Sequence, residues 1–363
     1  MRGELNPQGH MFSYFSPEQR VPRDHPLRAI KRHADEALKP LAATFEVMYS
    51  DTGRPSIPPE RLLKASLLIA LYSIRSDRLF CEQLDYNILF RWFLDMSLEE
   101  DPFDPSTFSK NRERLMGYDV ALSFFDAVVK LAREKGLLSD DHFTVDGTLI
   151  EAWASLKSFK AKSKQKTPPP DDPGNPSVDF HGEARSNATH ESTTDPQARL
   201  AKKGAGKESR LAFSGHALME NRHGLCLDIH IRTADGYAER EAALKMLARQ
   251  GRKRIKPKTL GADKGYHTKD FVARLRRRGI IPHVARIESR KTPGLDARTT
   301  RHDGYALSQK KRKRIEEIFG WMKTVGGLRK TRVRGIARTQ LLAHLTGAAY
   351  NLLRISRLCP ATG

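Results

Sequence analysis

The sequence predicts an α/β protein: a helical N-terminal part over residues 1–138, then a mixed sheet flanked by helices over residues 139–358. Two observations carry this prediction. Up to about residue 138, apolar residues recur at helical spacing. Beyond it, runs rich in β-branched and aromatic residues are joined first by hairpin-like turns and then by further helical runs, which is the order of a mixed α/β sheet.

The N-terminal part has the start and stop signals of several helices. Pro58 and Pro59 open the run PPERLLKASLLIALYSI, because proline is tolerated in a first helical turn. Ser76 is positioned to cap one helix through DRLFCEQLDYNILFRWFLDM, and Asp104 restarts the chain before TFSKNRERL. The amphipathic run DVALSFFDAVVKLAREKG ends at Gly136, a C-terminal signal.

The second part predicts strands and helices in a definite order. The strand HFTVDGTLIE comes first, and residues 211–219 and 225–231 then flank a hairpin-like turn. Residues 225–231 alternate apolar and polar, so we expect a half-buried strand. The helix EREAALKMLARQ, the strand TLGAD, the helix FVARLRRRG, a short strand at IIPHVA and a last helix follow.

A segment from about 160 to 210 lacks a core-forming pattern. Residues 161–210 contain six prolines and only Val178, Phe180 and Leu200 as large apolar residues. Such a segment buries too little surface to offset its ordering entropy. We therefore expect a flexible insertion that is dispensable for folding, with His181 and His190 exposed to solvent.

Composition restricts the class of function. The net charge of +21 is typical of proteins that neutralise nucleic-acid phosphates. No run of about 20 apolar residues would span a membrane, and the N-terminus lacks the apolar core of a secretory signal. The three cysteines form neither a disulfide framework nor a CxxC pair, which fits a reducing cytoplasm. Together these features lead us to expect a cytoplasmic protein with no membrane partner.

Three acidic residues are the strongest candidates for catalysis. Asp146 lies within a strand, Asp263 ends another strand between Gly261 and Gly265, and Glu316 lies on the last helix. Their oxygens are hard ligands that suit Mg²⁺ or Mn²⁺, and a pair of such ions promotes phosphoryl transfer. Singly, each acid is more simply explained as a solvated residue; their combination in so basic a chain favours a metal site.

The last helix also carries basic residues around its glutamate. Arg312, Glu316 and Lys323 are spaced to share one face, beside an apolar stripe of Ile315, Ile318, Phe319 and Met322. We expect Glu316 to bind metal and Arg312 and Lys323 to bind phosphate. Adjacent Glu317 points about 100° further round the helix, so Glu316 is preferred.

Other basic residues are candidates for DNA contact. Residues 310–338 contain eleven Lys or Arg and two Glu. An isolated basic run is usually a solvated charged face. Because this run surrounds the proposed catalytic glutamate, we instead expect phosphate contacts from Arg329, Lys330, Arg332 and Arg334. The helix after Ser106 presents Lys110 and Arg112, which suit phosphate contact, although an ordinary solvated helix face explains them as well.

These motifs together resemble the DDE transposases encoded by bacterial insertion sequences. VDGTLIEAW and GADKGY are similar to the first and second aspartate regions, and GHALMENRHG to the hairpin between them. Arg312, Glu316 and Lys323 match the branch whose third region reads Y-(2)-R-(3)-E-(6)-K, with Gln309 at the tyrosine position. The similarity spans roughly residues 140–355, and the helical N-terminus resembles the family's DNA-binding part.

The resemblance implies a ribonuclease-H-like core in which Asp146, Asp263 and Glu316 bind two Mg²⁺ ions, for which Mn²⁺ substitutes. It implies terminal inverted repeats as the DNA substrate, hydrolysis at the element ends, and attack of the freed 3′-hydroxyl on target DNA. Pairing two ends implies a homodimer or larger assembly. Two alternatives share these features: a metal-dependent nuclease without strand transfer, and an inactive transposase-derived DNA-binding regulator.

Overall fold

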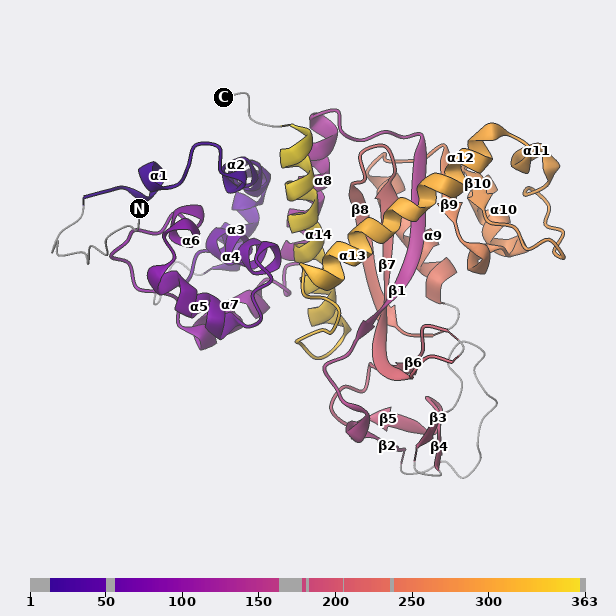
Figure 1. Cartoon of the computed structure of the whole chain (residues 1–363), viewed down its shortest axis with the longest axis horizontal. Helices are drawn as coiled ribbons and strands as arrows, with labels where there is room; N and C mark the ends of the chain where they lie inside the picture. Colours follow the sequence, from indigo (N-terminus) through magenta and orange to yellow (C-terminus); the bar gives the residue numbers. More distant parts are fainter. Residues whose placement is uncertain are drawn as a thin grey trace, which may run out of the picture.

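The computed structural model describes residues 14–49, 56–162, 178–180, 183–204, 206–235 and 238–359. Helices α1–α7 form one side of the molecule and a long sheet forms the other (Figure 1). Helices α8 and α14 stand side by side between them, and a group of short strands projects from one end of the sheet. No helix within these ranges is both long and apolar enough to span a bilayer.

The N-terminal helices begin at the predicted caps. Ser76 Oγ accepts a hydrogen bond from the amide of Leu79, and Asp104 does the same for Thr107. The single helix predicted after Ser76 is wrong, because Asn87 ends one helix and caps the next. The helices are α1 (Pro17–Arg20), α2 (Pro26–Leu38), α3 (Ala42–Met48), α4 (Pro59–Leu71), α5 (Asp77–Tyr86), α6 (Ile88–Phe93), α7 (Pro105–Arg114) and α8 (Val120–Glu134).

The main sheet is mixed, as predicted. Strand β1 (His142–Glu151) runs antiparallel to β7 (Arg210–Glu220) and parallel to β9 (Thr259–Ala262), and β10 (Ile281–Val284) extends the parallel side. Strands β8 (Cys226–Thr233) and β6 (Arg199–Ala201) both pair with β7. A long antiparallel hairpin following β1, with two parallel strands on its other side, confirms the predicted ribonuclease-H-like core.

Helices cover both faces of this sheet. In Figure 1, α13 crosses in front of the strands and α9 lies behind them. Helix α14 packs on β8 and α8, so it joins the sheet to the helical part. The helices of this part are α9 (Ala238–Arg252), α10 (Lys269–Arg277), α11 (Ala297–Thr300), α12 (Asp303–Lys311), α13 (Ile315–Thr324) and α14 (Ile336–Leu358).

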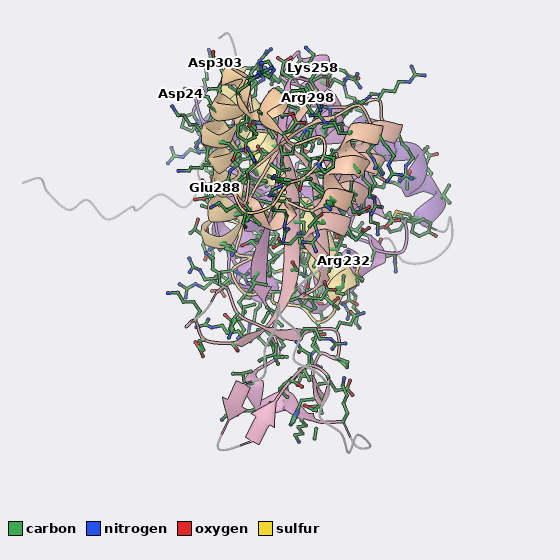
Figure 2. The ribbon with its side chains drawn as sticks, turned by 90° about the vertical axis from the view of Figure 1, so that its right-hand side faces the viewer. Asp24, Arg232, Lys258, Glu288, Arg298 and Asp303 are labelled. Carbon is green, nitrogen blue, oxygen red and sulfur yellow. The ribbon has the colours of Figure 1, made fainter. Side chains whose placement is uncertain are left out.

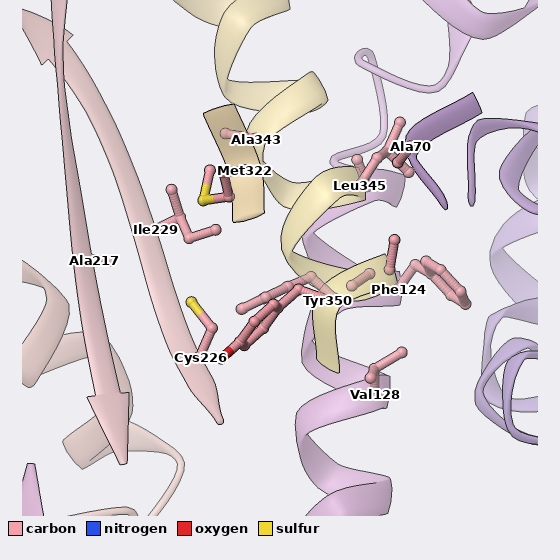
Figure 3. Packing of buried hydrophobic residues seen from close by; sticks show 14 of the residues in the cluster. Ala70, Phe124, Val128, Ala217, Cys226, Ile229, Met322, Ala343, Leu345 and Tyr350 are labelled. Carbon is pink, nitrogen blue, oxygen red and sulfur yellow. The ribbon is translucent and has the colours of Figure 1, made fainter. Parts of the chain in front are cut away.

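One hydrophobic core runs through the described parts of the chain. Figure 3 shows Leu345 and Tyr350 of α14 among side chains from both sides, with Ile229 of β8 on one and Phe124 of α8 on the other. These residues belong to a single cluster that reaches from α2 to α14. Burial of this apolar surface therefore stabilises both parts together.

Strand β8 is buried on both faces, so the prediction of a half-buried strand is wrong. Cys226 and Asp228 are buried as fully as Leu227 and Ile229, because α14 packs on one face and α9 on the other. Asp228 is paired with Arg249 of α9, whose Nη2 and Nε donate over 2.6 and 2.9 Å. This ion pair fixes α9 to the sheet.

The second half of the insertion forms strands, so the expectation of a segment without structure is wrong there, as is the expectation that His190 is exposed. His190 is buried and stacks on Phe159, where β5 (His190–Ser192) pairs with β2 (Phe159–Ala161). Strand β3 (Val178–Phe180) pairs with β4 (Glu183–Arg185), and β6 joins the main sheet. His181 lies outside the described residues. The composition of the segment led us to underestimate its burial, because the residues that cover it come from elsewhere in the chain.

The second half of the insertion also caps α14. Asp195 is buried, and its Oδ2 accepts a hydrogen bond of 2.9 Å from the amide of Gly335. Gln197 Oε1 accepts another of 2.8 Å from the amide of Ile336. These groups satisfy amides at the helix start that have no intrahelical partner.

We predict that Arg249→Met lowers the free energy of unfolding by about 3–5 kcal/mol, because it leaves the Asp228 carboxylate buried and unpaired. Urea denaturation measures the change. Arg252→Met, at an exposed position on the same helix, should change stability by less than about 0.5 kcal/mol. Equal effects of the two substitutions would contradict a structural role for the ion pair.

We predict that Asp195→Ala lowers stability by about 1–3 kcal/mol, because the amide of Gly335 loses its acceptor. Glu208→Ala is the control: this exposed residue pairs with Arg210 at the surface, where ion pairs contribute little. Thermal or urea unfolding of both variants measures the difference. Wild-type stability of Asp195→Ala would support the expectation that the insertion is dispensable.

Candidate active site

Asp146 lies in the middle of β1, where the sheet is enclosed by helices. The amide of Gly147 donates a hydrogen bond of 2.7 Å to its Oδ1. Burial, together with the charges of Asp263 and Glu316, raises the pKa of Asp146 to about 6, while the Gly147 hydrogen bond and Arg312 act in the opposite direction. Asp146 is therefore within electrostatic reach of both other predicted acids.

Strand pairing aligns Asp263 with Asp146. The parallel register places Thr144 opposite Gly261, so the two aspartates, each two residues further along, come level. Asp263 follows the last residue of β9, at the carboxyl end of a parallel strand where α/β sheets place ligand sites. Its Oδ1 accepts a hydrogen bond of 2.8 Å from the amide of Gly265, which holds the carboxylate in place.

Glu316 lies in the first turn of α13. The predicted continuous helix is interrupted, since α12 ends at Lys311 and a 3₁₀ turn, Arg312–Arg314, precedes α13. The predicted apolar stripe packs inward, with Ile315, Ile318 and Met322 buried.

The two adjacent glutamates differ in their surroundings. Glu317 makes ion pairs with Arg314 at 3.4 Å and Arg354 at 3.3 Å. Glu316 instead lines a groove together with Asp146. The arrangement supports Glu316 as the residue that faces the other acids.

This groove has a volume of about 820 Å³ and runs between β1, α13 and the end of β6. Asp146 and Glu316 border it, as does Phe319, which is only partly buried. Its remaining charged side chains are mostly basic: Lys203, Lys207, Arg210, Lys323 and Arg329, with Glu151 and Glu208. A groove with acids at one point and cations along its length suits a polyanionic strand that reacts beside the acids.

Two of the predicted basic residues are held toward the acids by other side chains. Arg312 Nε donates a hydrogen bond of 3.0 Å to Gln309 Oε1, and Gln309 in turn donates to the carbonyl of His283 on β10. Lys323 donates to the hydroxyl of Thr148, two residues after Asp146 on β1. Burial lowers the pKa of Lys323, and the nearby cations Lys203 and Arg329 lower it further.

Several predicted DNA contacts have partners within the protein. Arg112 forms two hydrogen bonds of 2.6 Å with the carboxylate of Asp77, and Arg332 donates to the carbonyl of Ile74. Both border a separate cavity of about 460 Å³ that none of the three acids lines. Lys330 lies 3.6 Å from a Glu151 oxygen, while Lys110, Arg329 and Arg334 are exposed. The structure thus gives Arg112 and Arg332 a role in joining elements.

Glu239 is a further acid at the site that sequence reasoning missed. It lies in the first turn of α9. Burial raises its pKa to about 6, with additional effects from Asp263 and Asp146. The sequence around it, EREAALKMLARQ, reads as an ordinary helix start, because acidic residues there are favourable to the helix dipole. No local signal distinguished Glu239 from Glu241.

The donor set fits divalent cations. Hard carboxylate oxygens suit Mg²⁺ or Mn²⁺, and the mutual repulsion of these acids would be relieved by positive charge between them. The hydroxyl of Tyr266 is fully buried and has no hydrogen-bond partner among the described residues, although it lies within electrostatic reach of Asp146, Asp263 and Glu239. Across the same part of the chain, no three acidic, histidine or cysteine side chains form a group that could hold a metal ion as they stand.

Comparison with solved structures gives only distant likenesses, and no curated protein matches the chain. A piggyBac transposase synaptic complex with hairpin DNA is 11% identical, with a TM-score of 0.39, covering 92% of this chain and 76% of that one. A Mos1 transposase paired-end complex with left transposon end is 12% identical, with a TM-score of 0.21, covering 76% of this chain and 82% of that one. A Mos1 mariner paired-end complex with Mn is 12% identical, with a TM-score of 0.20, covering 85% of this chain and 88% of that one. Likenesses this distant support no inference about the site.

Two family models match separate parts of the sequence and together cover most of it. Residues 15–114 match the family described as "Transposase domain (DUF772)". Residues 140–352 match the family described as "Transposase DDE domain", which spans every element that positions Asp146, Asp263 and Glu316. Since that match covers more than half of the chain, the protein belongs to the DDE transposase family and is an enzyme of the polynucleotidyl transferase and endonuclease class.

Proposed function

We propose that the protein binds the terminal inverted repeats of a mobile DNA element, cleaves at the element ends and joins the 3′-hydroxyl to target DNA. One observation supports this above all others: β1, β9 and α13 bring Asp146, Asp263 and Glu316 together beside a groove lined with cations. A phosphodiester of a strand lying in that groove would come within reach of Asp146 and Glu316, with Asp263 level with Asp146 at the end of β9.

Asp146, Asp263 and Glu316 would hold two divalent ions, Mg²⁺ in the cell with Mn²⁺ as a substitute. When bound, the pair of ions stabilises the attacking and leaving oxygens of an in-line displacement. Burial and the neighbouring carboxylates raise the pKa of Asp146, and positive charge bound beside it would relieve both effects.

The basic side chains position the DNA backbone. Lys203, Lys207 and Arg329 line the groove and would contact phosphates away from the reacting bond. Arg312 and Lys323 are fixed by Gln309 and Thr148, so they would hold the phosphates nearest the acids with little loss of side-chain freedom.

The spacing of the third motif supports membership of the branch that reads Y-(2)-R-(3)-E-(6)-K. Gln309 replaces the tyrosine, and its side-chain amide anchors Arg312 to β10. We propose that this anchoring role takes the place of a direct contact from a tyrosine. Lys110, Lys330 and Arg334 are proposed to extend phosphate contact beyond the groove.

The chain is proposed to work in the bacterial cytoplasm as a homodimer or larger assembly, because two element ends must be joined. Residues 1–138 would bind DNA, and residues 139–358, which include the insertion at about 160–210, would catalyse. Lys203, Lys207 and Glu208, near the end of the insertion, line the groove. Incubating the protein with Mg²⁺, an end-bearing duplex and a supercoiled target distinguishes the candidate functions. Joined products support transposition, cleavage alone indicates a nuclease, and binding alone indicates a regulator.

We predict that Asp146→Ala, Asp263→Ala and Glu316→Ala each reduce Mg²⁺-dependent cleavage by roughly a thousandfold or more, since the bound ions supply several kcal/mol of transition-state stabilisation. Binding of the same duplex in a gel-shift assay should be largely retained. Glu317→Ala is the matched control, because its carboxylate pairs with Arg314 and Arg354. Normal cleavage by any of the first three variants would remove that residue from the site.

We predict that replacing Lys203, Lys207 and Arg329 together by alanine weakens binding of every DNA sequence and flattens its salt dependence. For duplex DNA, the log–log salt slope should fall by roughly 0.9 for every phosphate that the variant no longer neutralises. Fluorescence anisotropy at several salt concentrations measures the slope.

The control for this measurement removes the same number of charges elsewhere, at Lys130, Lys258 and Arg298. All three are exposed and outside the groove, and Figure 2 shows Lys258 and Arg298 at the end of the molecule away from the short strands. Equal slopes for the groove variant and wild type would place the DNA path elsewhere.

A further inference from the structure

We propose that Glu239 is a fourth carboxylate ligand of the catalytic centre, binding the divalent ion held by Asp146 and Asp263 from the α9 face of the sheet. The inference rests on the proposed metal-dependent function and extends it to a residue outside the three-acid motif. Glu316 would approach the same ions from the α13 face, since α13 and α9 lie on opposite sides of β1 (Figure 1).

Two glycines make room for the Glu239 side chain. A Cβ atom on Gly147 would lie 3.2 Å from Glu239 Oε1, and one on Gly265 would lie 3.5 Å from its Oε2. Gly147 directly follows Asp146, and Gly265 binds Asp263 Oδ1 through its amide. The carboxylate therefore reaches from α9 to Gly147 and to the Gly265 turn that holds Asp263, within electrostatic reach of Asp146.

Polar atoms that lack partners among the described residues face the same space and point to a ligand there. His216 is fully buried on β7, opposite Gly147; its Nε2 shares a hydrogen bond with Ser214, but its Nδ1 makes none within those residues. That Nδ1 would lie 3.1 Å from a Cβ on Gly147, next to Glu239 Oε1. The buried hydroxyl of Tyr266 lies within electrostatic reach of Glu239.

Buried polar atoms normally find hydrogen-bond partners. The Nδ1 of His216 and the hydroxyl of Tyr266 are suited to bind water molecules that hydrate a cation. Both enclose the site without adding charge to it.

On the α9 side of the site, the carboxylates of Asp146, Asp263 and Glu239 outnumber the nearby cations. Arg240, adjacent to Glu239, donates to the carbonyl of Gly265 over 2.9 Å. Within the described ranges Glu239 has no ion pair within 4 Å, whereas Glu241 in the same helical turn pairs with Arg274 at 2.7 Å. Three carboxylates brought together at this depth repel one another, and a divalent ion between them would remove that cost.

The test compares Glu239→Gln with Glu241→Gln in the full-length protein. Isothermal titration with MnCl₂ in the absence of DNA should show Mn²⁺ affinity at least tenfold weaker for Glu239→Gln and unchanged for Glu241→Gln. The melting temperature of metal-free Glu239→Gln should equal or exceed that of wild type, because a repelling charge is removed. Glu239→Asp should recover part of the affinity.

Two outcomes would overturn the assignment. Wild-type Mn²⁺ affinity in Glu239→Gln would show that Glu239 is not a ligand, and loss of its cooperative unfolding would show a structural role instead. Asp146→Asn separates this inference from the proposed function. Normal Mn²⁺ binding and cleavage in Asp146→Asn would reject both; an inactive Asp146→Asn beside a normal Glu239→Gln would reject only the role of Glu239.

Discussion

The close packing of α14 against β8 and α8 is the constraint on which the rest of the molecule depends. Gly347 lies at the crossing point, where a Cβ atom would meet Ile229 at 2.6 Å and Phe125 at 2.9 Å. Asn351, one turn further on, hydrogen-bonds the amide and carbonyl of Cys226 on β8. A larger residue at 347 would separate the helical part from the sheet, because interiors are packed too densely to absorb it.

The sheet connects this crossing with the three proposed catalytic acids. Strand β8 pairs with β7, β7 pairs with β1, and the parallel register of β1 with β9 brings Asp146 level with Asp263. Helix α13 contacts both α14 and β1, so the same packing also positions Glu316. Rigid secondary structure on every side holds these side chains, as a preorganised site requires.

The acidic residues of the site are gathered in a chain whose net charge is strongly positive. A protein of net charge +21 concentrates acids at one enclosed point and places cations along the adjoining groove. Burial and the neighbouring acids raise the pKa of Asp146 and of Glu239, and such shifts are typical of functional sites. Cations such as Arg112, Arg249 and Arg332 instead serve the fold, each bound to a carboxylate or carbonyl of the protein.

The sequence alone determined the features that depend on local pattern: the caps at Ser76 and Asp104, the order of strands and helices, and the three acids in their motifs. Repeat period and capping chemistry act over a few residues, so they are readable without a fold. Only tertiary structure decided the burial of Asp228 and His190 and the approach of Glu239 to the aspartates. These features depend on contacts between residues that are far apart in the sequence, and no local sequence pattern predicts such contacts.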